Sequence, residues 1–198
     1  IPIKDSKLWR SADEAGGSSF CKPTRQINVG NVPIGNGHPI SIQTMTTTLT
    51  HDVDDTMRQV DRCVEAGVQI VRVAVPEQRD ANALKALVQR SSVPIVSDIH
   101  FNYTFALDAV DAGVAKVRIN PGNIGNEDRI AQVLAAAKAA KIPIRIGVNE
   151  GSLERDLLDK YPSPTAEALV ESAMRHVQIC QDHNFEDVAV SIKSSDPL

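Results

Sequence analysis

The feature that most limits the possible folds of this chain is a regular alternation of short apolar runs with longer amphipathic windows. The apolar runs predict strands at residues 40–46, 70–75, 94–100, 116–120, 143–149 and 188–193. The windows between them predict helices at residues 52–66, 79–89, 103–112, 127–140 and 165–182. Strands joined in this way by helical crossovers pair in parallel, so the alternation predicts an α/β fold with a parallel sheet.

An internal repeat favours a barrel over an open sheet. The sequence AGVQIVRV at 66–73 returns as AGVAKVRI at 112–119, which is the spacing of two strand–helix units. A doubly wound open sheet is the alternative, but the G-x-G-x-x-G turn after a first strand is absent. We therefore predict an incomplete TIM-type (β/α) barrel in which about six of the eight strands are present.

The chain divides into two parts. Residues 1–24 lack sustained periodicity and predict a loose N-terminal arm, and residues 25–198 form the partial barrel, a substrate-binding domain. Within the latter, residues 25–37 alternate apolar residues between glycines and predict a hairpin that plugs or flanks the bottom of the barrel. Because two strands are missing, the chain is either a piece of a longer protein or has its open edge covered by another molecule.

Composition excludes several classes of partner. The formal net charge is −4 with acidic and basic residues interleaved, which argues against nucleic acid and anionic membranes as partners. No apolar run is long enough to span a bilayer and no signal-peptide pattern is present, so we expect a cytoplasmic protein. Cys21, Cys63 and Cys180 are widely spaced and form no C-x-x-C pair, so no metal site is predicted.

Polar side chains interrupt strands that should be almost wholly apolar. These candidate site residues are Arg72, Asp98, His100, Arg118, Asn120, Arg145, Asn149 and Lys193. Those that share a strand are two or four residues apart and therefore lie on one face of it. Since barrel active sites form at the C-terminal ends of the strands, all eight are expected to converge on one mouth.

Four of these residues are cations, and we expect Asp98, the one acid among the eight, to offset a single charge. Such a cluster is costly without a counter-charge, so it predicts a multiply charged anion as ligand, which guanidinium groups bind well. Some readings stay open: His100 fits a core histidine equally well, residues 120–125 form an anion-contacting or a simple turn, and residues 150–164 form a lid or a surface insertion. The remaining histidines, for which only surface or capping roles are expected, are His38, His51, His176 and His183.

A set of co-linear phrases carries a resemblance to a known family. They are VGNVPIG at 29–35, IVRVAVP at 70–76, DIHF at 98–101, VRINPGNIG at 117–125, IRIGVNEGS at 144–152 and SIKSSD at 191–196. Over residues 24–196 the chain resembles the bacterial 4-hydroxy-3-methylbut-2-enyl-diphosphate synthases of the non-mevalonate isoprenoid pathway.

The resemblance implies an oxidoreductase of terpenoid biosynthesis that reductively opens 2-C-methyl-D-erythritol 2,4-cyclodiphosphate. It implies a 4Fe-4S cluster, flavodoxin or ferredoxin as electron donor, and a homodimer at full length. By resemblance, the eight candidate residues hold the substrate, with Asp98 orienting the others.

The resemblance also implies that part of the catalytic machinery is missing from this sequence. The family's acidic catalytic residue is expected at the end of the final strand of the barrel, beyond Leu198, the last residue of the chain. The cluster ligands belong to a C-terminal iron–sulfur domain that is likewise absent from the chain. No catalytic residue is therefore assigned within residues 1–198, and we expect the chain alone to be inactive.

Two other functions remain open at this point. One is a non-catalytic diphosphate-binding barrel. The other is a transferase like dihydropteroate synthase, whose barrel also binds a diphosphate ester.

Overall fold

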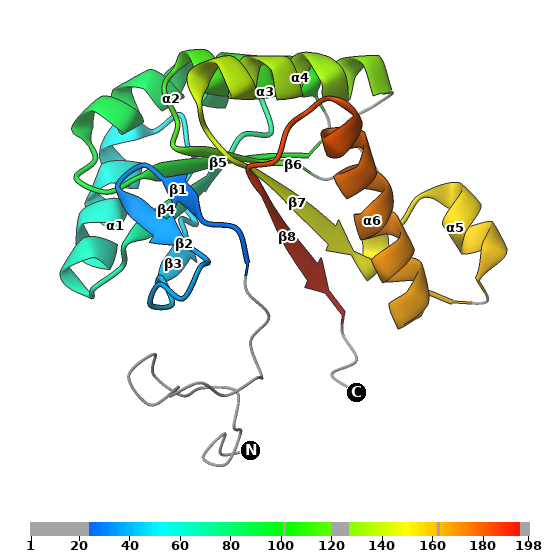
Figure 1. Ribbon diagram of the computed structural model, residues 1–198. Coiled ribbons are helices and arrows are strands. Elements are labelled where there is room, and N and C mark those ends of the chain that lie inside the picture. Colours follow the sequence, from blue (N-terminus) through cyan, green and yellow to red (C-terminus); the bar gives the residue numbers. More distant parts are fainter. Residues whose placement is uncertain (1–23, 101, 120–126, 162, 195–198) are drawn as a thin grey trace.

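The computed structural model describes residues 24–100, 102–119, 127–161 and 163–194. Its main sheet has six parallel strands whose order follows the chain. They are β3 (Gln43–Met45), β4 (Ile70–Ala74), β5 (Ile95–Ile99), β6 (Lys116–Ile119), β7 (Ile144–Asn149) and β8 (Val188–Lys193). The sheet curls into a half-barrel with β3 and β8 at its two edges (Figure 1), which confirms the predicted incomplete TIM-type barrel. The predicted arm lies outside the described residues, apart from its last residue.

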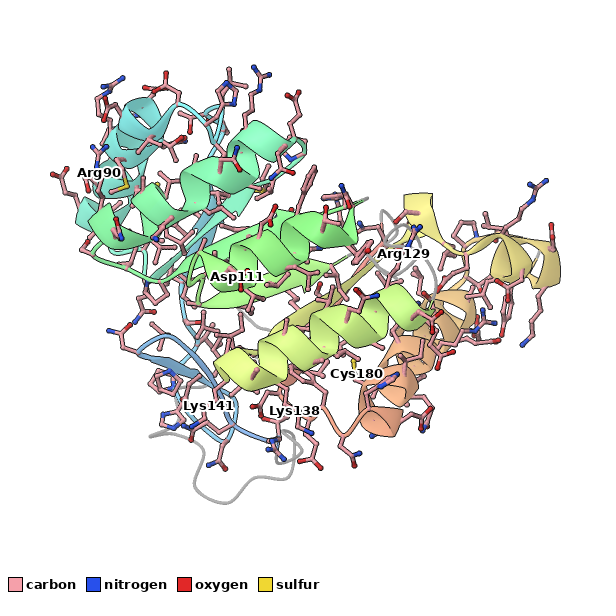
Figure 2. The ribbon with its side chains drawn as sticks, turned by 90° about the horizontal axis from the view of Figure 1, so that it is seen from above. Arg90, Asp111, Arg129, Lys138, Lys141 and Cys180 are labelled. Atoms are coloured by element: carbon pink, nitrogen blue, oxygen red, sulfur yellow. The ribbon has the colours of Figure 1, made fainter. Side chains whose placement is uncertain are left out.

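Helices follow the strands and cover the outer, convex face of the sheet (Figure 1). They are α1 (Val53–Glu65), α2 (Gln78–Arg90), α3 (Tyr103–Asp111), α4 (Glu127–Ala140) and α6 (Ala166–Asp182). Viewed from above, α2, α3 and α4 lie side by side, and Lys138 and Lys141 mark the end of α4 near the hairpin (Figure 2). Two predicted helix starts are confirmed, because Asp52 and Thr165 accept backbone N–H groups of the first turns of α1 and α6.

The alternation of side chains along each strand separates an apolar layer from a polar one. On the convex face, fully buried residues such as Val71, Val117 and Ile146 pack with the helices into one hydrophobic core. The positions that alternate with them along the same strands point into the concave interior and include Arg72 and Arg118. The core therefore lies between sheet and helices, and it leaves the interior available for polar groups.

The predicted hairpin is present and covers the bottom of the half-barrel. Strands β1 (Ile27–Val29) and β2 (Val32–Ile34) pair antiparallel through a two-residue turn. Gly30 takes a φ of 59° there, and a Cβ on it would lie 2.8 Å from the Pro94 ring. Val29 packs with Ile70 and Val96, near the N-terminal ends of β4 and β5, so the hairpin closes the end opposite the mouth.

The connection after β7 contains the short helix α5 (Arg155–Lys160), which the sequence did not predict. Figure 1 shows α5 beside α6. Its Leu157 is fully buried, and Glu154 just before it lies 2.7 Å from the ring Nε2 of His176 on α6. Helix α5 is thus braced on α6. The expected surface or capping role for His176 was wrong, because that side chain is buried in this contact.

One prediction was too long at the sheet edge. Strand β3 covers three residues instead of the predicted seven at 40–46, and Ile40 and Ile42 are exposed. An edge strand pairs on one side only, so apolar residues alone did not extend it. In the described part of the chain, no helix has the length and apolar character that crossing a membrane requires.

Candidate anion-binding site

The strand register places the charged residues in rows across the concave face. Asp98 on β5 is paired with Arg118 on β6, which is paired with Arg145 on β7. Paired residues of parallel strands point to the same side, so these three share the interior. Arg72 on β4 also points there, one step nearer the hairpin, because it is paired with Val96, which lies two residues before Asp98.

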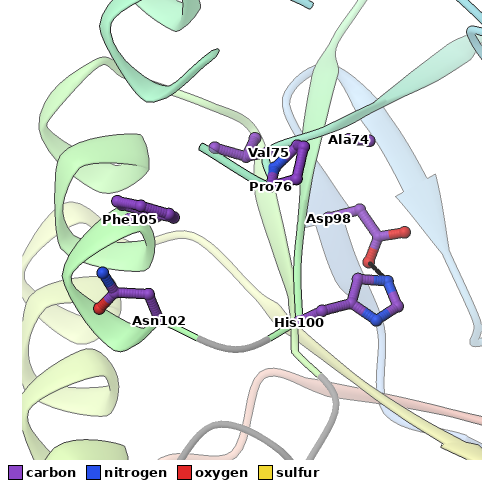
Figure 3. A pocket seen from close by; sticks show the side chains of 7 residues that line it. All are labelled: Ala74, Val75, Pro76, Asp98, His100, Asn102 and Phe105. Carbon is purple, nitrogen blue, oxygen red and sulfur yellow. Dashed lines mark ion pairs between the residues drawn. The ribbon is translucent and has the colours of Figure 1, made fainter. Parts of the chain in front are cut away.

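Asp98 is the centre of the cluster. Its side chain is buried, and its Oδ1 lies 2.9 Å from Nη1 of Arg118 and 3.3 Å from Nε2 of His100 (Figure 3). Its Oδ2 lies 3.6 Å from Nε of Arg72. The two oxygens of this carboxylate reach arginines on both neighbouring strands, so its single negative charge is shared between two cations.

Arg118 is held on every side. Its side chain is 6% exposed, and Nη1 lies 2.9 Å from Nε2 of His100 in addition to its bond to Asp98. Nη2 donates to the Gly147 carbonyl at 3.3 Å. It also donates to the side-chain oxygen of Asn149 at 3.2 Å when the Asn149 amide is oriented so that its oxygen and its nitrogen both have partners. A Cβ on Gly147 would lie 2.7 Å from Nη2, so this glycine makes the space that the guanidinium occupies. The structure thus brings together five candidate residues on, or directly after, strands β4 to β7. They are Arg72, Asp98, His100, Arg118 and Asn149.

Arg145 has a polar partner but no carboxylate of its own among the described residues. Its Nε donates to Ser191 Oγ on β8 at 2.9 Å. Burial lowers the pKa of Arg145, and the nearby charges of Arg72 and Arg118 lower it further, with Asp98 acting in the opposite direction. The guanidinium therefore lies in a field that favours an added negative charge.

Lys116 is a fourth interior cation that sequence reasoning missed. It is the first residue of β6, is 3% exposed, and its Nζ lies 3.4 Å from Gln43 Oε1 on β3. Burial, together with the charges of Arg145 and Arg72, lowers the pKa of Lys116 to about 8. A signal was present, because Lys116 and Arg118 are two residues apart on one strand and so share a face.

The interior therefore has an excess of positive charge. Among the described residues, Arg72, Lys116, Arg118 and Arg145 surround Asp98, the one carboxylate that forms ion pairs within this group. Burying like charges without compensation costs several kcal/mol per ion. The arrangement is accordingly one that a multiply charged anion would stabilise.

Two candidate residues lie at the C-terminal ends of neighbouring strands. Asn149 and Lys193 end β7 and β8 and are paired in the register, with the Lys193 side chain exposed. Asn120 and its glycine-rich turn lie outside the described residues. Leu198, beyond which the acidic catalytic residue is expected, also lies outside them, since the description of this end of the chain stops at Ser194. The expected position of that acid therefore stays a prediction.

A pocket lies beside Asp98 and His100. It has a volume of about 130 Å³, and its other walls include Pro76 and Phe105 (Figure 3). This pocket offers apolar contacts next to the charged cluster.

The described residues do not fit an iron–sulfur cluster. They include no group of three or more His, Cys, Asp or Glu side chains placed to hold a metal ion. Cys63 and Cys180 are free thiols on α1 and α6. Burial raises the pKa of Cys180 to about 11, which disfavours the thiolate that metals bind.

Sequence comparison identifies the family. A family model described as the GcpE TIM-barrel domain matches residues 24–198. Curated relatives named 4-hydroxy-3-methylbut-2-en-1-yl diphosphate synthase (flavodoxin) include those of Listeria monocytogenes, 55% identical over 89% of this chain, and Idiomarina loihiensis, 57% identical over 88%. The relative from a Ruegeria species is 53% identical over 95%. The chain spans about half the length of these relatives, 48%, 47% and 48% respectively.

Comparison with solved structures shows the fold. The dihydropteroate synthase of Vibrio fischeri superposes with a TM-score of 0.60 at 14% identity, over 84% of this chain and 66% of that one. The Yersinia pestis dihydropteroate synthase gives 0.59 at 14% identity, over 83% and 61%. At this identity the likeness concerns the architecture alone.

Proposed function

The chain belongs to the GcpE TIM-barrel domain family, and we propose on that basis that it is the substrate-binding barrel portion of an oxidoreductase of isoprenoid biosynthesis. The reaction is the reductive opening of 2-C-methyl-D-erythritol 2,4-cyclodiphosphate to 4-hydroxy-3-methylbut-2-enyl diphosphate. The observation that carries the proposal is the cluster of Arg72, Arg118 and Arg145 around Asp98, which matches a ligand with two linked phosphates.

The geometry supports a separate role in binding for each part of the cluster. Arg118 is held in place by Asp98 and by the Gly147 carbonyl, so its charge is preorganised at the centre of the site and attracts phosphate with little further loss of side-chain entropy. Arg145, tied to Ser191, retains donors for a second phosphate group. Asn149 and Lys193 at the strand ends, together with Asn120, complete the binding set at the mouth.

The carbon skeleton of the ligand has a place beside this cluster. The pocket next to Asp98 and His100 is lined on its far side by Val75, Pro76 and Phe105. These walls exclude water from one side of the ligand, and that strengthens the electrostatic contacts on the other side.

Electron transfer requires groups that the described residues do not supply. We propose a 4Fe-4S cluster whose ligands lie outside this chain, with flavodoxin or ferredoxin as electron donor; the names of the relatives specify flavodoxin. We also propose a homodimer at full length and a cytoplasmic location, without nucleic acid or membrane partners. The barrel portion then binds and orients the substrate and is inactive alone, with the acidic catalytic residue supplied from beyond Leu198.

A binding titration tests the proposal. The cyclic diphosphate is titrated by calorimetry into the protein expressed from its native reading frame, into Arg118→Ala, and into Arg175→Ala as a surface control. Loss of about 2 kcal/mol or more of binding free energy is expected for Arg118→Ala alone, since that side chain makes charge-assisted contacts. Equal affinity in all three proteins, or absence of binding to the unsubstituted protein, would overturn the assignment.

A further inference from the structure

Lys116 extends across the floor of the concave interior. Its backbone lies on β6, opposite Val96 of β5, and its Nζ reaches Gln43 on β3, with β4 and β5 lying between those two strands. It lies two residues before Arg118 on the same strand face and is nearer the hairpin. The ammonium group therefore lies beneath the guanidinium cluster.

The partners of Lys116 do not neutralise it. Gln43 offers a neutral carbonyl oxygen at 3.4 Å, and no carboxylate of the described residues forms an ion pair with this lysine. The titratable and charged groups that face the interior from the neighbouring strands are Arg72 on β4, Asp98 and His100 on or just after β5, Arg118 on β6 itself and Arg145 on β7. Asp98 is already engaged by Arg72 and Arg118.

A purely structural role does not explain a lysine at this position. An apolar side chain of similar length would fill the same space without the desolvation cost of a charge, and such replacements of buried ions often stabilise proteins. A cation kept in a buried, repulsive setting is instead typical of a binding site, where stability is given up for function.

We propose that Lys116 is a further anion-binding residue that forms the floor of this site, and that in alkaline solution, where the amine of the free protein has lost its proton, it takes up a proton when the diphosphate binds. The inference rests on the proposed function and deepens it. The proton passes from a buffer acid to the lone pair of Nζ, and the charge it adds attracts the bound phosphates. In that pH range the protein of the free site carries less positive charge than the protein of the occupied one.

The direction of the linkage follows from the environment. Burial and the charges of Arg145 and Arg72 hold the pKa of Lys116 at about 8, and a bound anion raises it. Below about pH 7 the lysine is already protonated in both states, so binding takes up no proton there. Uptake is expected to be greatest between roughly pH 8 and 10, where the free protein has lost the proton and the complex retains it.

The variant-free test is calorimetry of the cyclic diphosphate at pH 6.5 and pH 8.5, each in two buffers of different ionisation enthalpy. We expect heats that depend on the buffer at pH 8.5 and not at pH 6.5, equivalent to a substantial fraction of one proton. Tight binding without buffer dependence at pH 8.5 would refute the inference while leaving the proposed function intact. No binding at all would overturn both.

Two variants assign the effect to Lys116. Lys116→Met is expected to abolish the uptake, to weaken binding on the order of tenfold at pH 6.5, and to raise the melting temperature of the free protein because a buried charge is removed. Lys116→Arg keeps a charge that does not titrate, so uptake is lost while affinity is retained. If Lys116→Met binds as tightly as the unsubstituted protein, or keeps its proton uptake, Lys116 has no part in anion binding.

Discussion

Two groups of polar side chains differ in how far carboxylates compensate their basic groups. One is the set of interior cations, and the other is the cluster between α5 and α6. Inside the half-barrel, Asp98 is the carboxylate for four described cations, Arg72, Lys116, Arg118 and Arg145, and among these four it forms ion pairs with only Arg72 and Arg118. Between α5 and α6, three basic side chains each lie 2.6–2.7 Å from a carboxylate oxygen. These pairs are Lys160 with Glu171, Arg175 with Asp156, and His176 with Glu154.

This difference distinguishes a cluster that binds a ligand from one that only stabilises the fold. A cluster in which every charge is paired needs no ligand, and it contributes only to the stability of the folded chain. An unbalanced buried cluster raises the free energy of the empty protein and becomes favourable when a ligand supplies the missing charge. The interior is thus the candidate site, and the α5–α6 cluster is the internal control.

The strongest test of this contrast is Asp98→Asn. Removing the buried carboxylate leaves two arginines facing each other, and we expect a loss of about 3 kcal/mol in the free energy of unfolding. Chemical denaturation measures it. Adding the cyclic diphosphate should raise the melting temperature of this variant. If the variant without ligand is as stable as the unsubstituted protein, the interior cations do not repel one another appreciably.

Gly147→Ala tests the site without changing any charge. The new Cβ would lie 2.7 Å from Nη2 of Arg118 and must displace that guanidinium, so we expect affinity for the diphosphate to fall about 30-fold, equivalent to about 2 kcal/mol. Gly151→Ala is the matched control, since a Cβ there meets nothing within 4 Å. Equal affinities in the two variants would argue that the position of Arg118 is unimportant.

Glu154→Gln tests the balanced cluster through pH. Burial opposes the charge on Glu154, but hydrogen bonds from His176 and the backbone outweigh it and lower the pKa from 4.5 to about 2. The carboxylate therefore stabilises the fold fully above pH 4.5, and this contribution is lost as the pH falls towards 2. We expect the variant to be about 1.5 kcal/mol less stable at pH 7, with the difference shrinking below pH 4. A difference that is constant over this pH range would contradict the pairing.

Arg175→Ala should have the smallest effect. Its side chain is 39% exposed, so loss of the contacts with Asp156 and Glu171 should cost about 0.5 kcal/mol and less at high salt. Affinity for the diphosphate should not change. A fall in affinity comparable to that of Arg118→Ala would erase the distinction between the two clusters.

Much of the fold could be predicted because its periodicity is local. Strand and helix positions follow from apolar spacing, and the hairpin follows from the glycines around residues 27–34. Helix α5 could not be predicted, since its six residues are stabilised by contacts with α6 rather than by their own pattern. The length of β3 likewise depended on its place at the sheet edge.

For this protein, the sequence alone determined which side chains share the concave face, because a strand alternates its side chains with a period of two whatever surrounds it. Only the tertiary structure decided how the charges there are balanced. Asp98 reaches arginines on both neighbouring strands, Lys116 crosses to β3, and Gly147 makes room for Arg118. Each of these contacts joins different strands, and the energy of a charge depends on the distances between strands that folding alone sets.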